Sequence, residues 1–201
     1  ALFEVLDGAD ELGVGWFTVY AFSTENWRRP VEEGEFLLRF NEEIMLGRQE
    51  ELHERNIRIR FIGRRDRRVP RRLVRRMEEA VALTRDNTGL TFTIAFNYGG
   101  RAELVDAVQR IVDAGTKRVS EKTIARNLYD PEMPDPDLVI RTSGEYRVSN
   151  FLLWELAYSE LVFSEALWPD FGRQHLYTAI KEFQDRDRRY GGIVDPGESI
   201  G

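Results

Sequence analysis

Short apolar runs recur along the chain, separated by longer segments in which apolar residues return every three or four positions. The run at residues 14–22, VGWFTVYAF, is almost wholly apolar and rich in β-branched and aromatic residues. Such a run predicts a strand buried on both faces. Shorter runs predict further strands at residues 57–62, 90–96, 138–140 and 161–163.

Helical periodicity fills most of the chain between these runs. It predicts helices at residues 1–12, 32–55, 69–85, 102–114, 121–128, 151–158 and 173–190. Ser120 is the expected N-cap of the helix at 121–128. The longest helix, at 32–55, carries an apolar stripe made of Phe36, Leu37, Phe40, Ile44 and Met45.

Strand and helix alternate throughout, and no repeat, low-complexity tract or linker divides the chain. This order predicts one α/β domain over residues 1–201, with a mainly parallel central sheet flanked by helices. In such sheets ligands bind beyond the carboxyl ends of the strands. The residues that follow each strand are therefore the candidates for chemistry.

Composition narrows the chemistry. The 201 residues carry a formal net charge of −6 and no cysteine, which excludes disulfides, thiolate metal sites and a Cys nucleophile. With only two histidines, a multi-histidine metal site is disfavoured. No apolar run approaches the ~20 residues that span a bilayer. The P-loop, GxGxxG and GxSxG motifs are all absent, so the markers of three common enzyme classes are missing.

One basic stretch, RRDRRVPRRLVRR at residues 64–76, invites a nucleic-acid interpretation. It contains no aromatic residue, and Glu78 and Glu79 follow it. The pattern and the net charge favour a solvated helix face over an RNA-binding module.

Three segments that follow predicted strands could carry chemistry. Residues 23–30, STENWRRP, place hydroxyls, a carboxylate, an amide, an indole and two guanidiniums together, which suits an anion with an apolar body. A capped strand-to-helix turn would give the same pattern. The two glycines in residues 97–101, NYGGR, allow close approach of a ligand or merely a tight turn.

Residues 141–150, RTSGEYRVSN, form the best anion site that the residues alone predict. Two arginines and three hydroxyls precede a helix expected to begin near Asn150, and helix N-terminal amides and guanidiniums both favour a phosphate. The alternative is an N-cap with surface ion pairs. Glu160 lies in an apolar run, where a carboxylate needs a partner. That partner is either Mg²⁺ with diphosphate oxygens or an arginine.

Taken together and in this order, these segments resemble the cis-prenyltransferase family, typified by undecaprenyl diphosphate synthase. The resemblance covers roughly residues 2–192. It rests on YAFSTENW at 20–27 with Arg29 and Pro30, FNYGGR at 96–101, DLVIRTSGE at 137–145, Arg147, SNFLLW at 149–154, Ala157, Tyr158, Glu160, WPDF at 168–171 and RYG at 189–191.

The resemblance implies a transferase that joins an allylic diphosphate, often farnesyl diphosphate, to isopentenyl diphosphate and releases diphosphate. It also implies Mg²⁺, a homodimer and a hydrophobic tunnel, which the stripe of the helix at 32–55 could wall. Asn26 would be catalytic, as a proton acceptor, and Glu160 would bind the metal. The substrate-binding residues would be Ser23, Thr24, Glu25, Trp27, Arg29, Arg141, Arg147, Val148, Ser149 and Arg189, the last reaching into the partner's site.

The family's first motif, an Asp-Gly-Asn-Gly-Arg loop, is absent from this chain, so we expect an N-terminal segment to be missing. A non-catalytic partner subunit of the same fold is the alternative to an enzyme. The expected product is a long-chain Z-polyprenyl diphosphate of undecaprenyl type, because Ala21 leaves room where some short-chain relatives carry a bulkier residue. A short-chain Z-farnesyl diphosphate synthase is the alternative. We expect a cytoplasmic enzyme with peripheral membrane contact through its lipid product, and no nucleic-acid partner.

Overall fold

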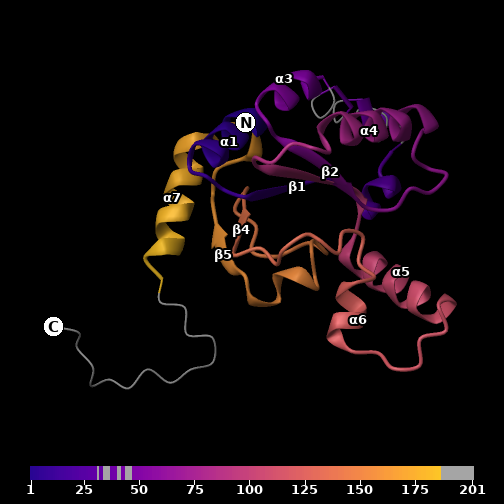
Figure 1. Ribbon diagram of the computed structural model, residues 1–201. Coiled ribbons are helices and arrows are strands. Elements are labelled where there is room, and N and C mark those ends of the chain that lie inside the picture. The colour runs from indigo at the N-terminus through magenta and orange to yellow at the C-terminus, as the bar shows by residue number, and fades with distance from the viewer. Residues whose placement is uncertain (31, 34–36, 40–41, 44–46, 187–201) are drawn as a thin grey trace, which may run out of the picture.

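A parallel three-stranded sheet forms the centre of the computed structural model, which describes residues 1–30, 32–33, 37–39, 42–43 and 47–186 (Figure 1). Strand β3 (Thr91–Tyr98) lies between β1 (Trp16–Ser23) and β2 (Arg58–Ile62), and every residue of β3 is buried. A second parallel pair joins β4 (Leu138–Arg141) to β5 (Glu160–Phe163). The strand pairs among the described residues are therefore all parallel, as the alternation of strand and helix predicts.

Helices cover the sheets on several sides (Figure 1). Helices α1 (Leu2–Glu11) and α7 (Arg173–Gln184) contact each other at one side, and α3 (Gln49–Glu54) and α4 (Arg71–Thr84) lie above β2. Helices α5 (Gly100–Asp113) and α6 (Glu121–Ala125) project at the opposite end. The Ser120 hydroxyl accepts a hydrogen bond from the Thr123 amide, which confirms the predicted N-cap of α6.

Strand β1 is only partly buried, where the prediction was full burial on both faces: Phe17, Val19 and Ala21 pack against the main core, and Tyr20 packs against a second cluster. It is an edge strand beside β3, and only Phe22 of its eight residues is fully buried. Two of its aromatic rings stack on rings of the neighbouring β3: Phe22 on Phe96 with ring centroids 5.2 Å apart, and Phe17 on Phe92 at 5.8 Å. A strand with one open edge can therefore carry a run typical of a central strand.

The helix predicted at residues 32–55 does not run unbroken. Arg48 leaves helical geometry, with φ −122° and ψ 23°, and α3 begins after it. Leu37 packs against the main core, whereas Phe36, Phe40, Ile44 and Met45 lie outside the described residues. The helix predicted at residues 121–128 ends at Ala125, and that predicted at 173–190 ends at Gln184.

The helix predicted at residues 151–158 is wrong. Ser149, Asn150 and Leu152 have φ values of +48°, +63° and +42°, which a right-handed helix cannot contain. Only a single 3₁₀ turn, η2 (Glu155–Tyr158), forms there. An apolar run of this length does not distinguish a buried helix from an irregular buried segment. The helix N-terminus expected to bind an anion near Asn150 therefore does not exist.

Candidate active site

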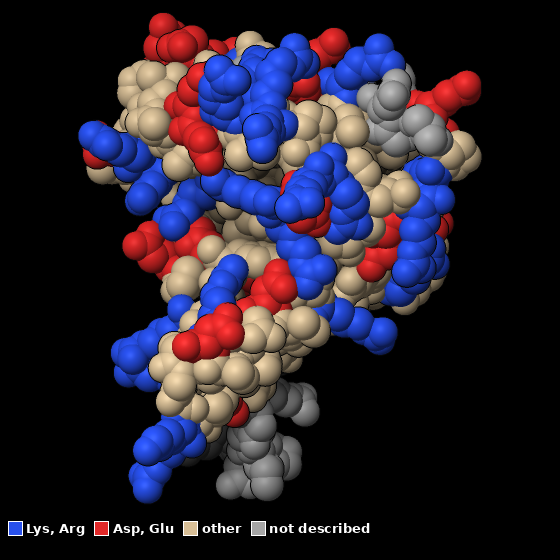
Figure 2. Space-filling view, turned by 90° about the vertical axis from the view of Figure 1, so that its right-hand side faces the viewer, with Lys and Arg blue, Asp and Glu red and all other residues tan. Residues whose placement is uncertain are grey.

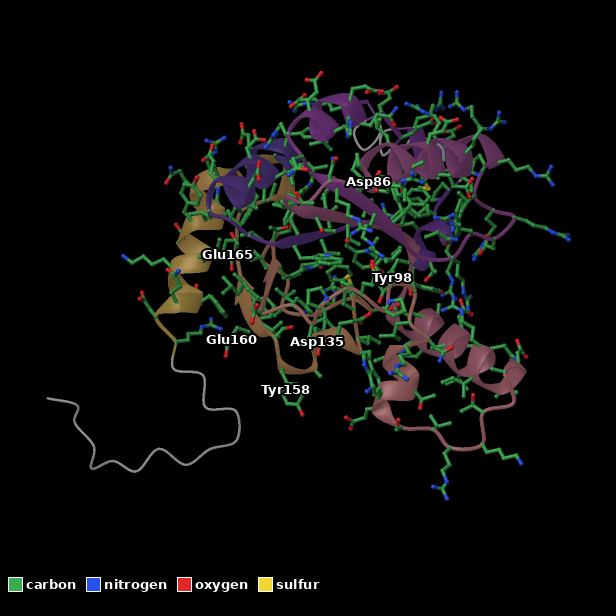
Figure 3. All side chains as sticks on the ribbon, viewed as in Figure 1. Asp86, Tyr98, Asp135, Tyr158, Glu160 and Glu165 are labelled. Carbon is green, nitrogen blue, oxygen red and sulfur yellow. The ribbon has the colours of Figure 1, made fainter. Side chains whose placement is uncertain are left out.

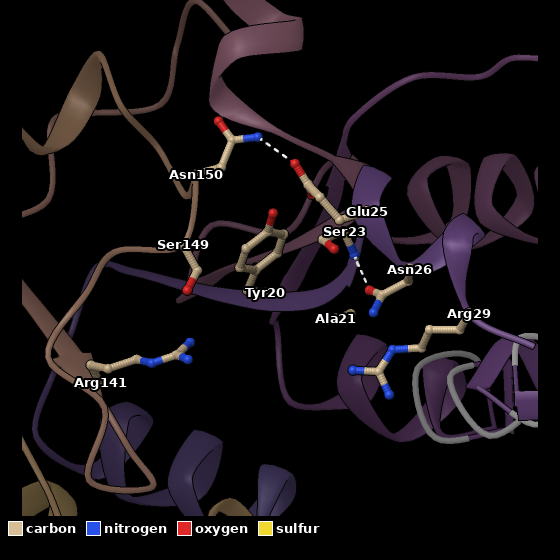
Figure 4. Close-up of a pocket in the computed structure, with 9 residues that line it drawn as sticks. All are labelled: Tyr20, Ala21, Ser23, Glu25, Asn26, Arg29, Arg141, Ser149 and Asn150. Atoms are coloured by element: carbon tan, nitrogen blue, oxygen red, sulfur yellow. Dashed lines mark hydrogen bonds between the residues drawn. The ribbon is translucent and has the colours of Figure 1, made fainter.

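A cavity of about 530 Å³ opens at the carboxyl ends of β1 and β4, where the sequence places its candidate residues (Figure 4). Ligands bind at this edge of open parallel sheets. The cavity is lined by Tyr20, Ala21, Ser23, Glu25, Asn26, Arg29, Arg141, Ser149 and Asn150.

One wall of the cavity comes from the short 3₁₀ helix η1 (Thr24–Arg28), which follows β1 directly. The backbone amide of Ser23 donates to Oδ1 of Asn26 over 2.6 Å, so the turn itself fixes the Asn26 amide at the wall. Arg29 extends from the end of this turn into the cavity region, and its guanidinium is 3.6 Å from Glu33 (Figure 4). More than half of each of these two side chains is exposed, so their ion pair is weak and breakable.

Glu25 stays ionised at this wall. Burial opposes its charge, but hydrogen bonds from Asn150 over 2.9 Å and from the Thr24 hydroxyl over 3.1 Å outweigh burial and lower the pKa of Glu25. An ionised carboxylate repels the negatively charged oxygens of a phosphate and has no proton to donate to them. It can accept hydrogen bonds or contribute to holding a cation.

The facing wall carries Arg141, Ser149 and Asn150. Arg141 donates to Glu145, and Arg147 lies 2.7 Å from the same carboxylate. The hydrogen bond from Arg141 is the largest cause that lowers the pKa of Glu145, and the positive charge of Arg147 lowers it further. Arg141 points its guanidinium toward the cavity (Figure 4), whereas its Nε is buried and has no hydrogen-bond partner among the described residues.

Four of the predicted binding residues that the structure describes do not line the cavity. Thr24 and Trp27 lie behind its wall: Trp27 donates to Oδ1 of Asn97 over 2.7 Å and packs edge-on against Phe22. Arg147 is two-thirds exposed and pairs with Glu145, and Val148 is half-buried. Arg189 lies outside the described residues.

Glu160 is separated from the cavity by the length of a short strand. It starts β5 opposite Leu138, whereas Arg141 ends β4 opposite Phe163. At about 3.3 Å per residue the two lie roughly 10 Å apart along the strands. Glu160, labelled in Figure 3, lies near the lower end of α7. It pairs with Arg186 over 2.9 Å, which is the arginine alternative of the sequence interpretation.

The described residues hold no group of three or more His, Asp or Glu side chains that could bind a metal ion. A hard cation such as Mg²⁺ needs about six oxygen ligands. Mg²⁺ commonly keeps several waters and is held by one or two carboxylates together with substrate phosphates, and the ionised Glu25 is the carboxylate among the residues that line the cavity.

Tyr20 and Asn150 line the cavity although the sequence assigned them no role there. The pairing of β1 with β3 shifts register between Tyr20 and Phe22, and this irregularity brings both Tyr20 and Ala21 to the cavity. Strict alternation along a strand would place only one of two successive residues there. Tyr20 stacks on Phe151 at 4.7 Å, and burial raises the pKa of its hydroxyl, which keeps it neutral.

Five arginines of the stretch at residues 64–76 form ion pairs with acidic side chains. Arg64 pairs with Asp106, Arg65 with Glu78, Arg68 with Asp66, and both Arg72 and Arg76 with the buried Glu42. Figure 2 shows Lys and Arg interspersed with Asp and Glu on the face it presents. These pairs support the solvated-face interpretation of the stretch. No described helix is long and apolar enough to cross a membrane.

An α/β fold whose parallel strands end at a cavity with opposed arginines defines a class of anion-binding enzymes. The family model described as "Putative undecaprenyl diphosphate synthase" matches residues 1–191, and the chain belongs to this family of prenyltransferases. It is thus a transferase of isoprenoid biosynthesis with cis-prenyltransferase activity, as the resemblance implied.

Curated relatives agree. The chain is 50% identical over 198 residues to the Trans,polycis-polyprenyl diphosphate synthase ((2Z,6E)-farnesyl diphosphate specific) of Thermobifida fusca, covering 96% of this chain and 70% of that protein. It is 47% identical over 196 residues to Isoprenyl transferase 2 of Corynebacterium glutamicum, covering 94% and 80%.

Two solved structures share the fold. A probable undecaprenyl diphosphate synthase from Campylobacter jejuni superposes with a TM-score of 0.87 at 30% identity, covering 94% of this chain and 89% of that one. Lavandulyl diphosphate synthase from Lavandula x intermedia, in complex with dimethylallyl diphosphate, gives 0.88 at 33%, covering 94% and 84%.

Proposed function

We propose that this chain condenses isopentenyl diphosphate with an allylic diphosphate, a farnesyl diphosphate, and repeats the reaction to give a long-chain Z-polyprenyl diphosphate of undecaprenyl type. The observation that carries the proposal is the cavity in which Asn26 and Arg29 face Arg141 and Ser149. The Thermobifida fusca relative, named a polyprenyl diphosphate synthase specific for (2Z,6E)-farnesyl diphosphate, supports the primer and the product class.

The reaction breaks the bond between C1 of the allylic substrate and its diphosphate oxygen. C1 bonds to the terminal alkene carbon of isopentenyl diphosphate, and a proton leaves C2 of that unit as the new double bond forms. Positive charge develops on carbon and negative charge on the departing diphosphate. Guanidinium groups placed beforehand stabilise that negative charge, and holding both substrates together makes the step intramolecular.

Each wall then has a task. Arg141 and Ser149, which line the cavity, hold the isopentenyl diphosphate. Arg147 assists from the rim through the carboxylate of Glu145, which it shares with Arg141. Asn26 is the proposed proton acceptor beside the reacting carbons, and the hydrogen bond from the Ser23 amide holds its side chain at the wall. Arg29 contacts the second substrate.

Mg²⁺ stays an expectation from the family, with Glu160 as its predicted ligand. A homodimer is also proposed. Val105, Val108 and Val112 lie on one face of α5 and are 62%, 50% and 64% exposed, and a second copy of the chain would cover such a face. Peripheral membrane contact is proposed because a long polyprenyl product belongs in a bilayer.

The test is incubation of the full-length protein with farnesyl diphosphate, labelled isopentenyl diphosphate and Mg²⁺, followed by chromatography of the labelled products. We expect long chains; a single addition would favour the short-chain synthase. No labelled product under any metal or detergent condition would refute the enzyme and support the non-catalytic subunit. Light scattering tests the dimer, which Val108→Glu should dissociate.

A further inference from the structure

Asn150 makes three hydrogen bonds that join segments distant in sequence. Its backbone carbonyl accepts from the Gly100 amide over 2.7 Å, and its Oδ1 accepts from the Arg101 amide over 2.8 Å. Its Nδ2 donates to Oε1 of Glu25 over 2.9 Å. The residue adopts a φ of +63°, a left-handed conformation that asparagine tolerates better than most residues.

Two of these bonds replace a missing helix cap. The first amides of an α-helix have no partner within the helix, and the N-cap residue of α5, Gly99, has no side chain to supply one. Asn150 satisfies the amides of Gly100 and Arg101 from another segment. A Cβ at position 99 would stand 2.6 Å from Oγ1 of Thr24 and 2.8 Å from Nδ2 of Asn150, so a larger residue there would displace one of these side chains.

The third bond crosses the cavity rim. Glu25 belongs to the wall that carries Asn26 and Arg29, and Asn150 to the wall that carries Ser149 and Arg141 (Figure 4). The Asn150–Glu25 hydrogen bond therefore joins the two walls directly. Asn150 is itself held by the amides of Gly100 and Arg101, at the start of α5 just after β3.

We propose that Asn150 is a positioning residue of the transferase: through Glu25 it fixes the spacing of the two walls that hold the two substrates. The inference rests on the proposed function for its effect on turnover. Reacting atoms must be held within a few tenths of an ångström, and a misplacement of about 1 Å can slow a reaction about a hundredfold.

The experiment is a double-mutant cycle on the full-length protein with Asn150→Asp and Glu25→Gln. Aspartate keeps an acceptor for the Arg101 amide but turns a second carboxylate toward Glu25. In the double variant a glutamine amide at position 25 can donate to the aspartate, which restores the bond in the reverse sense. Asn127→Asp is the matched control, since Asn127 donates to Thr123 at the end of α6, away from the cavity.

We expect Asn150→Asp to lower kcat about tenfold or more in the wild-type background, and by less than about threefold when Glu25 is already Gln. The decrease in kcat caused by Asn150→Asp should also become smaller as the pH falls, because a protonated aspartic acid at position 150 can again donate a hydrogen bond to Glu25. The exchange rates of the Gly100 and Arg101 amides should stay near those of the wild type in Asn150→Asp.

An equal loss in both backgrounds, or no loss at all, would overturn the proposal and leave Asn150 as a helix cap only. The same four proteins are titrated with inorganic pyrophosphate by calorimetry, where the same coupling is expected in Kd. If the wild type makes no product but pyrophosphate binding shows the coupling, the proposed function fails and the positioning role stands. Without coupling in either measurement the positioning role fails.

Discussion

Replacing Glu155 with glutamine is expected to stabilise the protein at neutral and alkaline pH, with an advantage that disappears as the pH falls toward 4.5. Glu155 is 3% exposed and faces Glu103, which is 2% exposed. Glu103 accepts hydrogen bonds from the Tyr98 hydroxyl and, over 2.8 Å, from the Tyr129 amide. Oε2 of Glu155 has no hydrogen-bond partner among the described residues.

Burial, and then the charge of Glu103, raise the pKa of Glu155 from 4.5 to about 8. Burial also raises the pKa of Glu103. The native pair thus holds a proton that the unfolded chain releases above pH 4.5. Between pH 4.5 and 8 the native state binds more protons than the unfolded state, so the free energy of unfolding falls as the pH rises, and it levels off above 8.

At about 1.4 kcal/mol for each tenfold change in proton affinity, this effect reaches at most about 5 kcal/mol at pH 8. Glutamine has the shape of the protonated acid and donates to Glu103 without needing a proton. The variant should therefore gain up to a few kcal/mol over the wild type at pH 8 and little at pH 5.

Urea unfolding followed by circular dichroism from pH 5 to 8.5 measures the difference between variant and wild type. Other groups, such as Asp130 with its raised pKa, contribute equally to both proteins and cancel in that difference. Glu54→Gln, at an exposed position on α3, is the control and should show no pH-dependent difference. A stability difference between Glu155→Gln and wild type that does not change with pH would refute the shared proton.

Three further changes test the site. Arg141→Gln should lower kcat/KM for isopentenyl diphosphate by about a hundredfold or more in steady-state kinetics, and more than Arg147→Gln, because only Arg141 lines the cavity. Ala21→Leu should shorten the products seen by chromatography, since a larger side chain fills the cavity beside β1. Chelation by EDTA should abolish turnover, and added Mg²⁺ should restore it. If the Glu160→Gln variant reaches half-maximal turnover at the same Mg²⁺ concentration as the wild type, Glu160 serves only its ion pair with Arg186.

The strands of the fold were predictable because their residues form the short apolar runs that are typical of buried parallel strands. The predicted strand at residues 90–96 became β3 (Thr91–Tyr98), and that at 138–140 became β4 (Leu138–Arg141). The segment at 151–158 was not predictable, because its course depends on three left-handed residues that hydrophobic periodicity does not report. The family motifs predicted which strand ends would meet, and the cavity confirms that meeting for Ser23, Asn26, Arg141 and Ser149.

What the sequence could not give is the choice between two physically sound partners. Glu160 needed a counter-charge, and both a cation and an arginine satisfied that need; only the position of Arg186 in space distinguishes them. Asn150 is the stronger case, because its side-chain partners lie 49 and 125 positions away. A residue that connects two distant segments leaves no periodic pattern in the sequence around it from which its role could be predicted. Its function therefore becomes visible only when the fold brings the strand ends together.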